Sequence, residues 1–95
     1  MSIDDLRLRR HEILSLADRH GARNVRVFGS VARSDDRPDS DIDLLIDVDR
    51  GRSLLDVIGF EQELGQLLGR RVEVQTVGGL SPYLQQRILD EAASL

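Results

Sequence analysis

Two short segments of the sequence combine residue types that could bind a nucleotide and a metal ion. Gly29 and Ser30 are followed, after ten intervening residues, by Asp41 and Asp43 in a run rich in Val, Ile and Leu. A strand places residues i and i+2 on one face, so the two aspartates would project together while Ile42 faces the core. Paired carboxylates repel each other unless a cation lies between them. Oxygen ligands of this kind suit Mg²⁺ that is bound together with substrate phosphates.

The Gly-Ser pair supplies the other half of the predicted site. Gly29 has no Cβ and lets the backbone approach a ligand closely. Ser30 stands where a short helix could begin and direct free N–H groups at phosphate oxygens. The two segments together predict a triphosphate cradle that faces a metal pair.

The elements that would position these residues alternate between helices and strands. Gly and Pro punctuation, serine caps and apolar periodicity give their approximate limits. Helices are predicted from about Ile3 to about His20, briefly within residues 30–40 before a polar turn at 35–39, from Ser53 to Gly69, and from Ser81 onward. Strands are predicted at residues 24–28, 41–48 and 71–77, with a turn at Gly78 and Gly79.

The apolar stripes of the three longer helices are expected to face the core. They comprise Ile3, Leu6, Ile13, Leu14 and Ala17 in the first, Leu54, Val57, Ile58, Leu64 and Leu68 in the second, and Leu84, Ile88 and Leu89 in the third. Ser53 and Asp56 have the spacing of a capping box, and Pro82 suits the first position of the third helix. The 95 residues predict one α/β domain, with a three-stranded core sheet and helices packed on one face.

The segments at residues 27–33 and 39–46 resemble the minimal nucleotidyltransferases of the DNA polymerase β superfamily. That family's pattern is a Gly-Ser turn, an Asp-x-Asp strand and a third carboxylate on a later strand. Glu73 is the one acidic residue of the strand predicted at 71–77, so it is assigned as the third carboxylate. Many members of the family carry Asp at this position, so Glu73 departs from the family pattern by one additional methylene group in the side chain. The resemblance covers nearly the whole chain and implies a mixed sheet with the three acids at one edge of an open cleft.

The resemblance also implies a role for each residue. Asp41, Asp43 and Glu73 would hold two Mg²⁺ ions around ATP, with Glu73 helping to remove the proton of the acceptor hydroxyl. Gly29 and Ser30 would hold the β and γ phosphates. Arg33 follows one helical turn later, and its guanidinium would grip phosphate oxygens.

Composition excludes several other classes of protein. The chain has no cysteine, so disulfides, zinc-thiolate sites and thiol nucleophiles are ruled out. All thirteen basic residues are Arg, which rules out a P-loop lysine. A net charge of −4 and 3% aromatic residues argue against direct nucleic-acid binding. No export signal or membrane span is expected, which favours a cytoplasmic protein.

Four other polar residues were considered for the site and left out. Asp47 shares the strand face of the aspartate pair but is expected to face solvent near the end of the strand. His11 and His20 are interpreted as surface residues. Tyr83 is expected to pack beside Pro82, although an exposed phenol near a nucleotide site would be open to self-modification.

The acceptor is expected to come to the open cleft, and a protein surface suits that geometry. Stand-alone minimal nucleotidyltransferases can act as antitoxins of an HEPN-domain ribonuclease toxin by adenylylating one of its tyrosines. The resemblance therefore predicts an ATP- and Mg²⁺-dependent protein adenylyltransferase antitoxin. Two alternatives remain open: a non-catalytic antitoxin that masks its partner, and a nucleotidyltransferase for small molecules of the aminoglycoside type. An exposed apolar patch on the second or third long helix would favour a homo-oligomer or a hetero-oligomer with the partner.

Overall fold

The structure is a computed structural model that describes residues 1–35 and 37–95. Asp36, in the predicted polar turn, lies outside the described residues. The helices are α1 (Ile3–Leu8), α2 (Arg10–Arg19), α3 (Gly29–Arg33), α4 (Leu54–Leu68) and α5 (Pro82–Glu91), with a 3₁₀ turn, η1 (Val77–Gly79). The strands are β1 (Ala22–Phe28), β2 (Ile42–Val48), β3 (Val72–Thr76) and β4 (Ala93–Ser94).

The strands form one mixed sheet in the order β3-β2-β1-β4. The strand β1 pairs antiparallel with β2 and with β4, whereas β2 and β3 run parallel. The predicted α/β class and the three core strands are confirmed, and β4 is an addition. Its two residues are too few to show a strand periodicity in the sequence.

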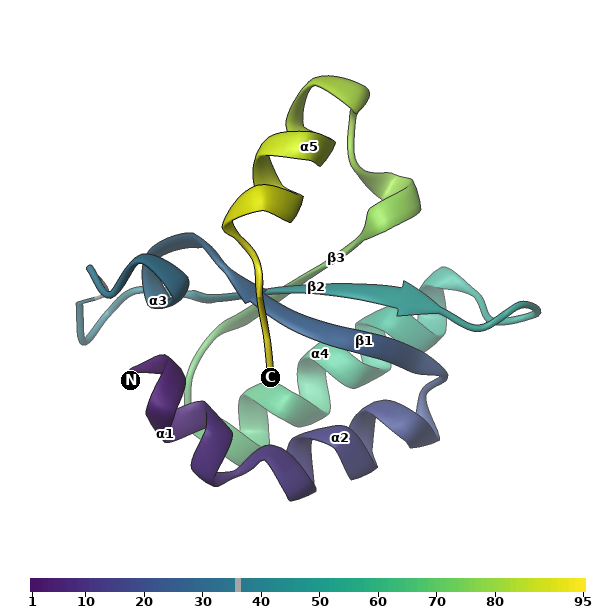
Figure 1. The fold of residues 1–95 in the computed structure, drawn as a ribbon. Coiled ribbons are helices and arrows are strands. Elements are labelled where there is room, and N and C mark those ends of the chain that lie inside the picture. The colour runs from purple at the N-terminus through teal and green to yellow at the C-terminus, as the bar shows by residue number, and fades with distance from the viewer. Residues whose placement is uncertain (36) are drawn as a thin grey trace.

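Helices α1, α2 and α4 lie on one face of the sheet, and α5 stands over the other face (Figure 1). The core fills the space between the sheet and the helices α1, α2 and α4. Its most deeply buried side chains are Leu6, Ile13, Val27, Val31, Ile42, Leu44, Ile46, Phe60 and Leu64. Each large apolar side chain buried in this way contributes roughly 1.5–3 kcal/mol. In residues 1–35 and 37–95, no helix is long and apolar enough to cross a lipid bilayer.

The predicted first helix is divided in two at Arg9. This residue leaves helical geometry, with φ −105° and ψ 17°, and ends α1 before α2 begins. Its guanidinium donates to the carbonyl oxygen of Leu67 at 3.0 Å, which ties the break to the end of α4. The break changes which residues of α2 face the core. Leu16 is buried, and the prediction that Leu14 is buried is wrong, since it is 41% exposed.

Helix α4 has the caps that its sequence predicts. Ser53 and Asp56 form both hydrogen bonds of the capping box, and Gly69 ends the helix in the left-handed region at φ 64°. The buried face consists of Val57, Phe60, Leu64 and Leu68. Leu54 and Ile58 are exposed, contrary to the prediction. Phe60 takes the central position because the stripe through residues 57, 60, 64 and 68 is the one that meets the sheet.

Helix α5 begins at Pro82 as predicted but has no fully buried residue. Ile88 is half-buried, whereas Leu84 is 48% exposed, so the predicted inward face is only partly correct. Tyr83 is 93% exposed, and the prediction that it packs is therefore wrong. These exposures have one cause: α5 stands over the open face of the sheet rather than in the helical layer (Figure 1).

Candidate active site

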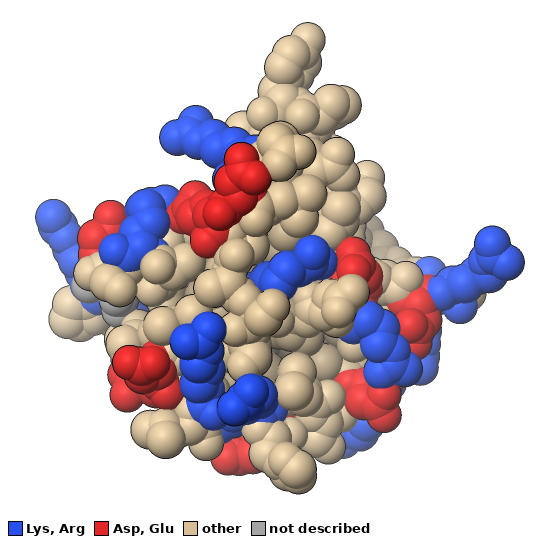
Figure 2. All heavy atoms as spheres, viewed as in Figure 1, with Lys and Arg blue, Asp and Glu red and all other residues tan. Residues whose placement is uncertain are grey.

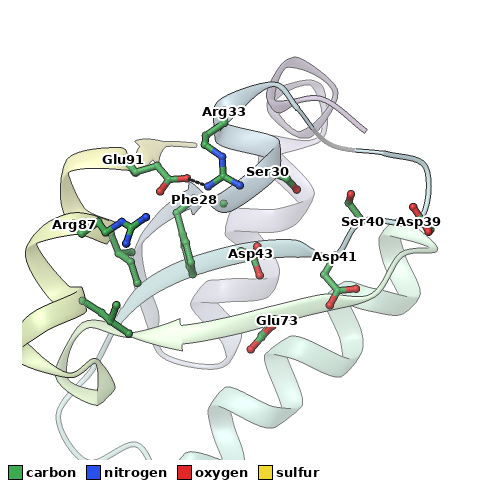
Figure 3. A pocket seen from close by; sticks show the side chains of 13 residues that line it. Phe28, Ser30, Arg33, Asp39, Ser40, Asp41, Asp43, Glu73, Arg87 and Glu91 are labelled. Carbon is green, nitrogen blue, oxygen red and sulfur yellow. Dashed lines mark hydrogen bonds and ion pairs between the residues drawn. The ribbon is translucent and has the colours of Figure 1, made fainter.

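One cavity of about 650 Å³ lies between the end of β1, helix α3, the start of β2, strand β3 and helix α5 (Figure 3). The six residues predicted for the site all line it: Gly29, Ser30, Arg33, Asp41, Asp43 and Glu73. The remaining lining residues are Phe28, Asp39, Ser40, Leu84, Arg87, Ile88 and Glu91. Residues that are distant in the sequence therefore meet around a single space.

The sheet register brings the three acidic residues together. Ile42 and Leu44 point into the core, so the alternating residues Asp41 and Asp43 are turned to the open face. In the parallel pairing of β2 with β3, Asp43 is the direct partner of Glu73. Figure 3 shows the three side chains along the adjoining parts of these strands.

Burial and electrostatic repulsion both act on Asp43. Burial, followed by the negative charges of Glu73 and Asp41, raises the pKa of Asp43 from 3.8 to about 6, while the positive charge of Arg33 opposes the change. A divalent cation among these carboxylates would relieve the repulsion. The donor set consists of carboxylate oxygens, which fits a hard ion such as Mg²⁺. Within the part of the chain that the structure describes, no three acidic, His or Cys side chains are already gathered closely enough to hold an ion.

Replacing Asp43 by Asn is expected to stabilise the metal-free protein near neutral pH and not in acid. The folded state keeps a proton on Asp43 that the unfolded chain releases, so native stability falls as the pH rises from 3.8 to about 6. The raised pKa corresponds to roughly 3 kcal/mol without screening, and solvent around this half-exposed group reduces that to about 1 kcal/mol. Urea unfolding with a chelator at pH about 7.5 and about 4 measures the difference. An equal gain at both pH values would contradict the raised pKa of Asp43 as the cause of the stabilisation.

Gly29 allows the turn between β1 and α3 to lie directly against Asp43. Its φ is +74°, and a Cβ at this position would overlap the Oδ2 atom of Asp43. Ser30 is half-buried beside it. No side chain caps the first turn of α3, because Phe28 precedes it. The backbone amides of that turn are therefore available to an anionic ligand.

Arg33 lines the cavity but is engaged by other residues. Its Nη1 atom lies 2.7 Å from Oε1 of Glu91, and its Nε lies 3.3 Å from Oδ2 of Asp35. The pair with Glu91 joins α3 to α5 across the cavity mouth (Figure 3). A phosphate contact by Arg33, as the sequence predicts, would require the guanidinium to exchange these partners.

Helix α5 contributes four cavity residues that sequence reasoning did not assign to the site: Leu84, Arg87, Ile88 and Glu91. Their spacing of three and four residues places them on one helical face, which the sequence alone predicts. That this face borders the cavity depends on the position of α5 over the open face of the sheet, which the sequence alone does not predict. Arg87 and Glu91 point from α5 toward the cavity in Figure 3.

Asp47, His11 and His20, which were considered from the sequence but not assigned to the site, do not line this cavity. Asp47 is partly exposed to solvent, as predicted, and its carboxylate also accepts a hydrogen bond from Nδ2 of Asn24 on β1 at 2.7 Å. His11 is exposed, as predicted. His20 is half-buried, with Nε2 3.1 Å from Oε2 of Glu63, and is not simply a surface residue.

Comparisons with known proteins identify the family to which the chain belongs. A family described as the nucleotidyltransferase domain matches residues 12–95. The chain MJ0435 of Methanocaldococcus jannaschii, which carries a protein adenylyltransferase name, is 36% identical over 95 residues, and the match covers 100% of this chain and 99% of that one. Protein adenylyltransferase MntA of Thermococcus cleftensis is 38% identical over 76 residues, with 80% and 77% covered.

Solved structures show the same architecture. A structure described as a minimal nucleotidyltransferase superposes with a TM-score of 0.89 at 49% identity, covering 100% of this chain and 97% of that chain. A toxin-antitoxin complex with AMP-PNP contains a chain with a TM-score of 0.76 at 19% identity, covering 88% of this chain and 69% of that chain, which supports the fold alone. With the family match over residues 12–95, these findings show that the chain belongs to the nucleotidyltransferase domain family, whose members are enzymes, and that it has the minimal form of that fold.

Proposed function

We propose that the chain transfers AMP from ATP to a hydroxyl group on a protein, in a reaction that depends on Mg²⁺. The observation that carries this proposal is the shared cavity of Gly29, Ser30, Asp41, Asp43 and Glu73. The acids face one space from two parallel strands, and the glycine turn approaches them from the side. Such an arrangement suits a triphosphate with its metal ions.

Each residue has a distinct role in the proposed mechanism. Asp41, Asp43 and Glu73 would hold two Mg²⁺ ions, which when bound neutralise charge on the attacking and leaving oxygens. Gly29 and Ser30 hold the β and γ phosphates through backbone amides and the hydroxyl group. Glu73 lines the cavity from β3, which is separated by β2 from the strand that leads into the glycine turn, and it accepts the proton of the acceptor hydroxyl.

We propose a tyrosine of an HEPN-domain toxin as the acceptor, which would make the chain a cytoplasmic antitoxin. The curated relatives carry protein adenylyltransferase names. A solved complex that holds a tri-AMPylated HEPN toxin of Shewanella oneidensis with an MNT antitoxin has the fold of this chain, with a TM-score of 0.70 at 18% identity. The face of the molecule in Figure 2 has Arg and acidic side chains interspersed, as in a surface suited to a folded protein partner rather than to a nucleic-acid backbone.

Incubating the chain with labelled ATP, Mg²⁺ and the HEPN-type product of a neighbouring gene tests the proposal. Label is expected on the partner and is expected to be lost after Tyr→Phe substitution of its modified residue. An unlabelled partner that is still neutralised would instead support the masking antitoxin. Pyrophosphate release with small hydroxyl compounds, but not with the protein, would support the small-molecule enzyme.

Glu73 offers a separate test of the proposed base. Glu73→Gln keeps the size of the side chain but cannot accept the proton, so transfer is expected to fall by about 10²-fold. Glu73→Asp keeps the carboxylate and is expected to retain most of the activity. Initial rates at saturating ATP measure both variants. Equal losses in the two variants would show that the position serves packing or geometry rather than proton transfer.

A further inference from the structure

A second pocket of about 340 Å³ adjoins the active-site cavity. Five residues line both spaces: Phe28, Asp43, Glu73, Leu84 and Ile88. The second pocket then extends to Gln75, Gly79, Leu80 and Ser81, whereas the first extends to the glycine turn. Asp43 and Glu73 therefore stand at the boundary between a space beside the Gly-Ser turn and a space beside η1 and α5.

The walls of the second pocket are more apolar than those of the first. Leu80, Leu84 and Ile88 form one side, and Phe28 contributes from β1. Gln75 and Glu73 supply a polar edge, with Nε2 of Gln75 donating to Oε1 of Glu73 at 3.2 Å. A pocket with apolar walls and a polar end fits a flat ring that carries a hydroxyl group, because such a ring buries its faces while its oxygen is hydrogen-bonded.

The wall made by η1 and the start of α5 is held in place by hydrogen bonds. The amide of Gly79 donates to Oγ1 of Thr76 at 3.0 Å. Nε2 of Gln85 donates to the carbonyl oxygen of Val77 at 3.3 Å. These contacts join the end of β3 to the first turn of α5, so the pocket is built into the fold before a ligand arrives.

Transfer of a phosphoryl-type group requires the attacking and leaving oxygens to lie roughly in line on opposite sides of the phosphorus. If pyrophosphate departs at the Gly29-Ser30 turn, the attacking oxygen approaches past Asp43 and Glu73 from the far side. The second pocket borders that approach, since it shares Asp43 and Glu73 with the first and extends to η1 and α5 instead of to the glycine turn. Resting on the proposed function, we propose that the second pocket is the acceptor subsite and takes the phenol ring of a tyrosine.

The transfer replaces one phosphorus–oxygen bond by another. The phenol oxygen forms a bond to the α-phosphorus, and the bond from that phosphorus to the oxygen bridging to the β-phosphorus breaks. Pyrophosphate leaves with the bonding electron pair. The phenol proton passes to the carboxylate of Glu73, which borders the pocket, and then to solvent.

Leu80→Glu tests the subsite because Leu80 lines the second pocket and not the first. The probe is N-acetyl-L-tyrosinamide, and both transfer to it and ATP affinity are measured. Leu80→Glu is expected to lower transfer at least about tenfold while ATP affinity stays within about twofold. The reason is that binding of the ring would bury the new carboxylate without a partner, at a cost in free energy that corresponds to about a tenfold loss or more. Leu54→Glu, on an exposed residue of α4, is the matched control and is expected to change neither.

A loss of ATP affinity in Leu80→Glu would mean that the pocket holds the nucleoside, and unchanged transfer would mean that it is unused. Either result overturns the proposal. A second measurement needs no variant: methyl NMR of the wild-type chain titrated with the probe in the absence of ATP and Mg²⁺. Shifts at Leu80 and Leu84 but not at Leu54 are expected, and their absence overturns the subsite. A probe that binds there without being adenylylated contradicts the proposed function and leaves the subsite standing.

Discussion

Replacing Asp41 and Asp43 together by Asn is expected to lower AMP transfer by about 10³-fold or more, because each roughly 1.4 kcal/mol of lost charge stabilisation costs a factor of ten. Both side chains face the cavity beside Glu73, and neither supports the core. The variant is therefore expected to fold normally and to melt no lower than the wild type, since it removes the carboxylate of Asp43, whose pKa is raised by burial and by the charges of Glu73 and Asp41. Transfer to the protein partner and thermal melting measure the two effects.

Asp47→Asn is the matched control for this double variant. Asp47 lies on the same strand, but its carboxylate is bound by Asn24 and Arg26 instead of facing the cavity. Its replacement is expected to change transfer by less than about twofold, while the loss of this partly exposed pair costs about 1 kcal/mol of stability or less. A large loss of activity in Asp47→Asn would show that charge on the strand matters in general rather than at the proposed metal ligands.

Gly29→Ala is expected to damage both stability and activity. A Cβ at φ +74° is strained by roughly 1–2 kcal/mol. The new methyl group would also overlap Oδ2 of Asp43, so the carboxylate must move. A displacement of about 1 Å in a positioning group can cost about 10²-fold in rate. We therefore expect a fall of this size in transfer, together with a melting temperature lowered by about 4–8 °C for each kcal/mol of strain.

Gly51→Ala separates backbone strain from the clash. Gly51 has φ +88°, and a Cβ there would meet no atom within 4 Å. It is expected to lose a similar amount of stability while transfer changes by less than about twofold. If both glycine variants lose activity equally, the loss follows from general destabilisation and not from the contact between Gly29 and Asp43.

The chemistry of the cavity was more predictable than the helices around it. A strand imposes a period of two, so the sequence was enough to place Asp41 and Asp43 on one face opposite Ile42 and Leu44. The partnership of Asp43 with Glu73 was not available from periodicity. It depends on β2 and β3 being parallel neighbours in one register, which the structure shows, whereas the resemblance implied only a mixed sheet with the three acids at one edge of a cleft.

Three features of the fold needed tertiary information. The break at Arg9 is fixed by a contact with the carbonyl of Leu67, almost sixty residues away along the chain. The stripe of α4 shifted toward Phe60 because the sheet, and not the helix alone, decides which side is buried. The face of α5 that carries Arg87 also carries Leu84 and Ile88, which were predicted to face the core, and it borders the cavity because α5 stands over the open face of the sheet (Figure 1, Figure 3).

Calorimetric titration of ATP into the wild-type chain, with Mg²⁺ and with a chelator, tests the central claim most directly. Three carboxylates that share one cavity repel a triphosphate unless cations lie between them. ATP is therefore expected to bind at least about tenfold more tightly with Mg²⁺, a difference of about 1.4 kcal/mol. The difference should vanish in the Asp41→Asn/Asp43→Asn double variant. Equal ATP affinity in the presence and absence of Mg²⁺ would contradict the proposal that Asp41, Asp43 and Glu73 form a metal-dependent nucleotide site.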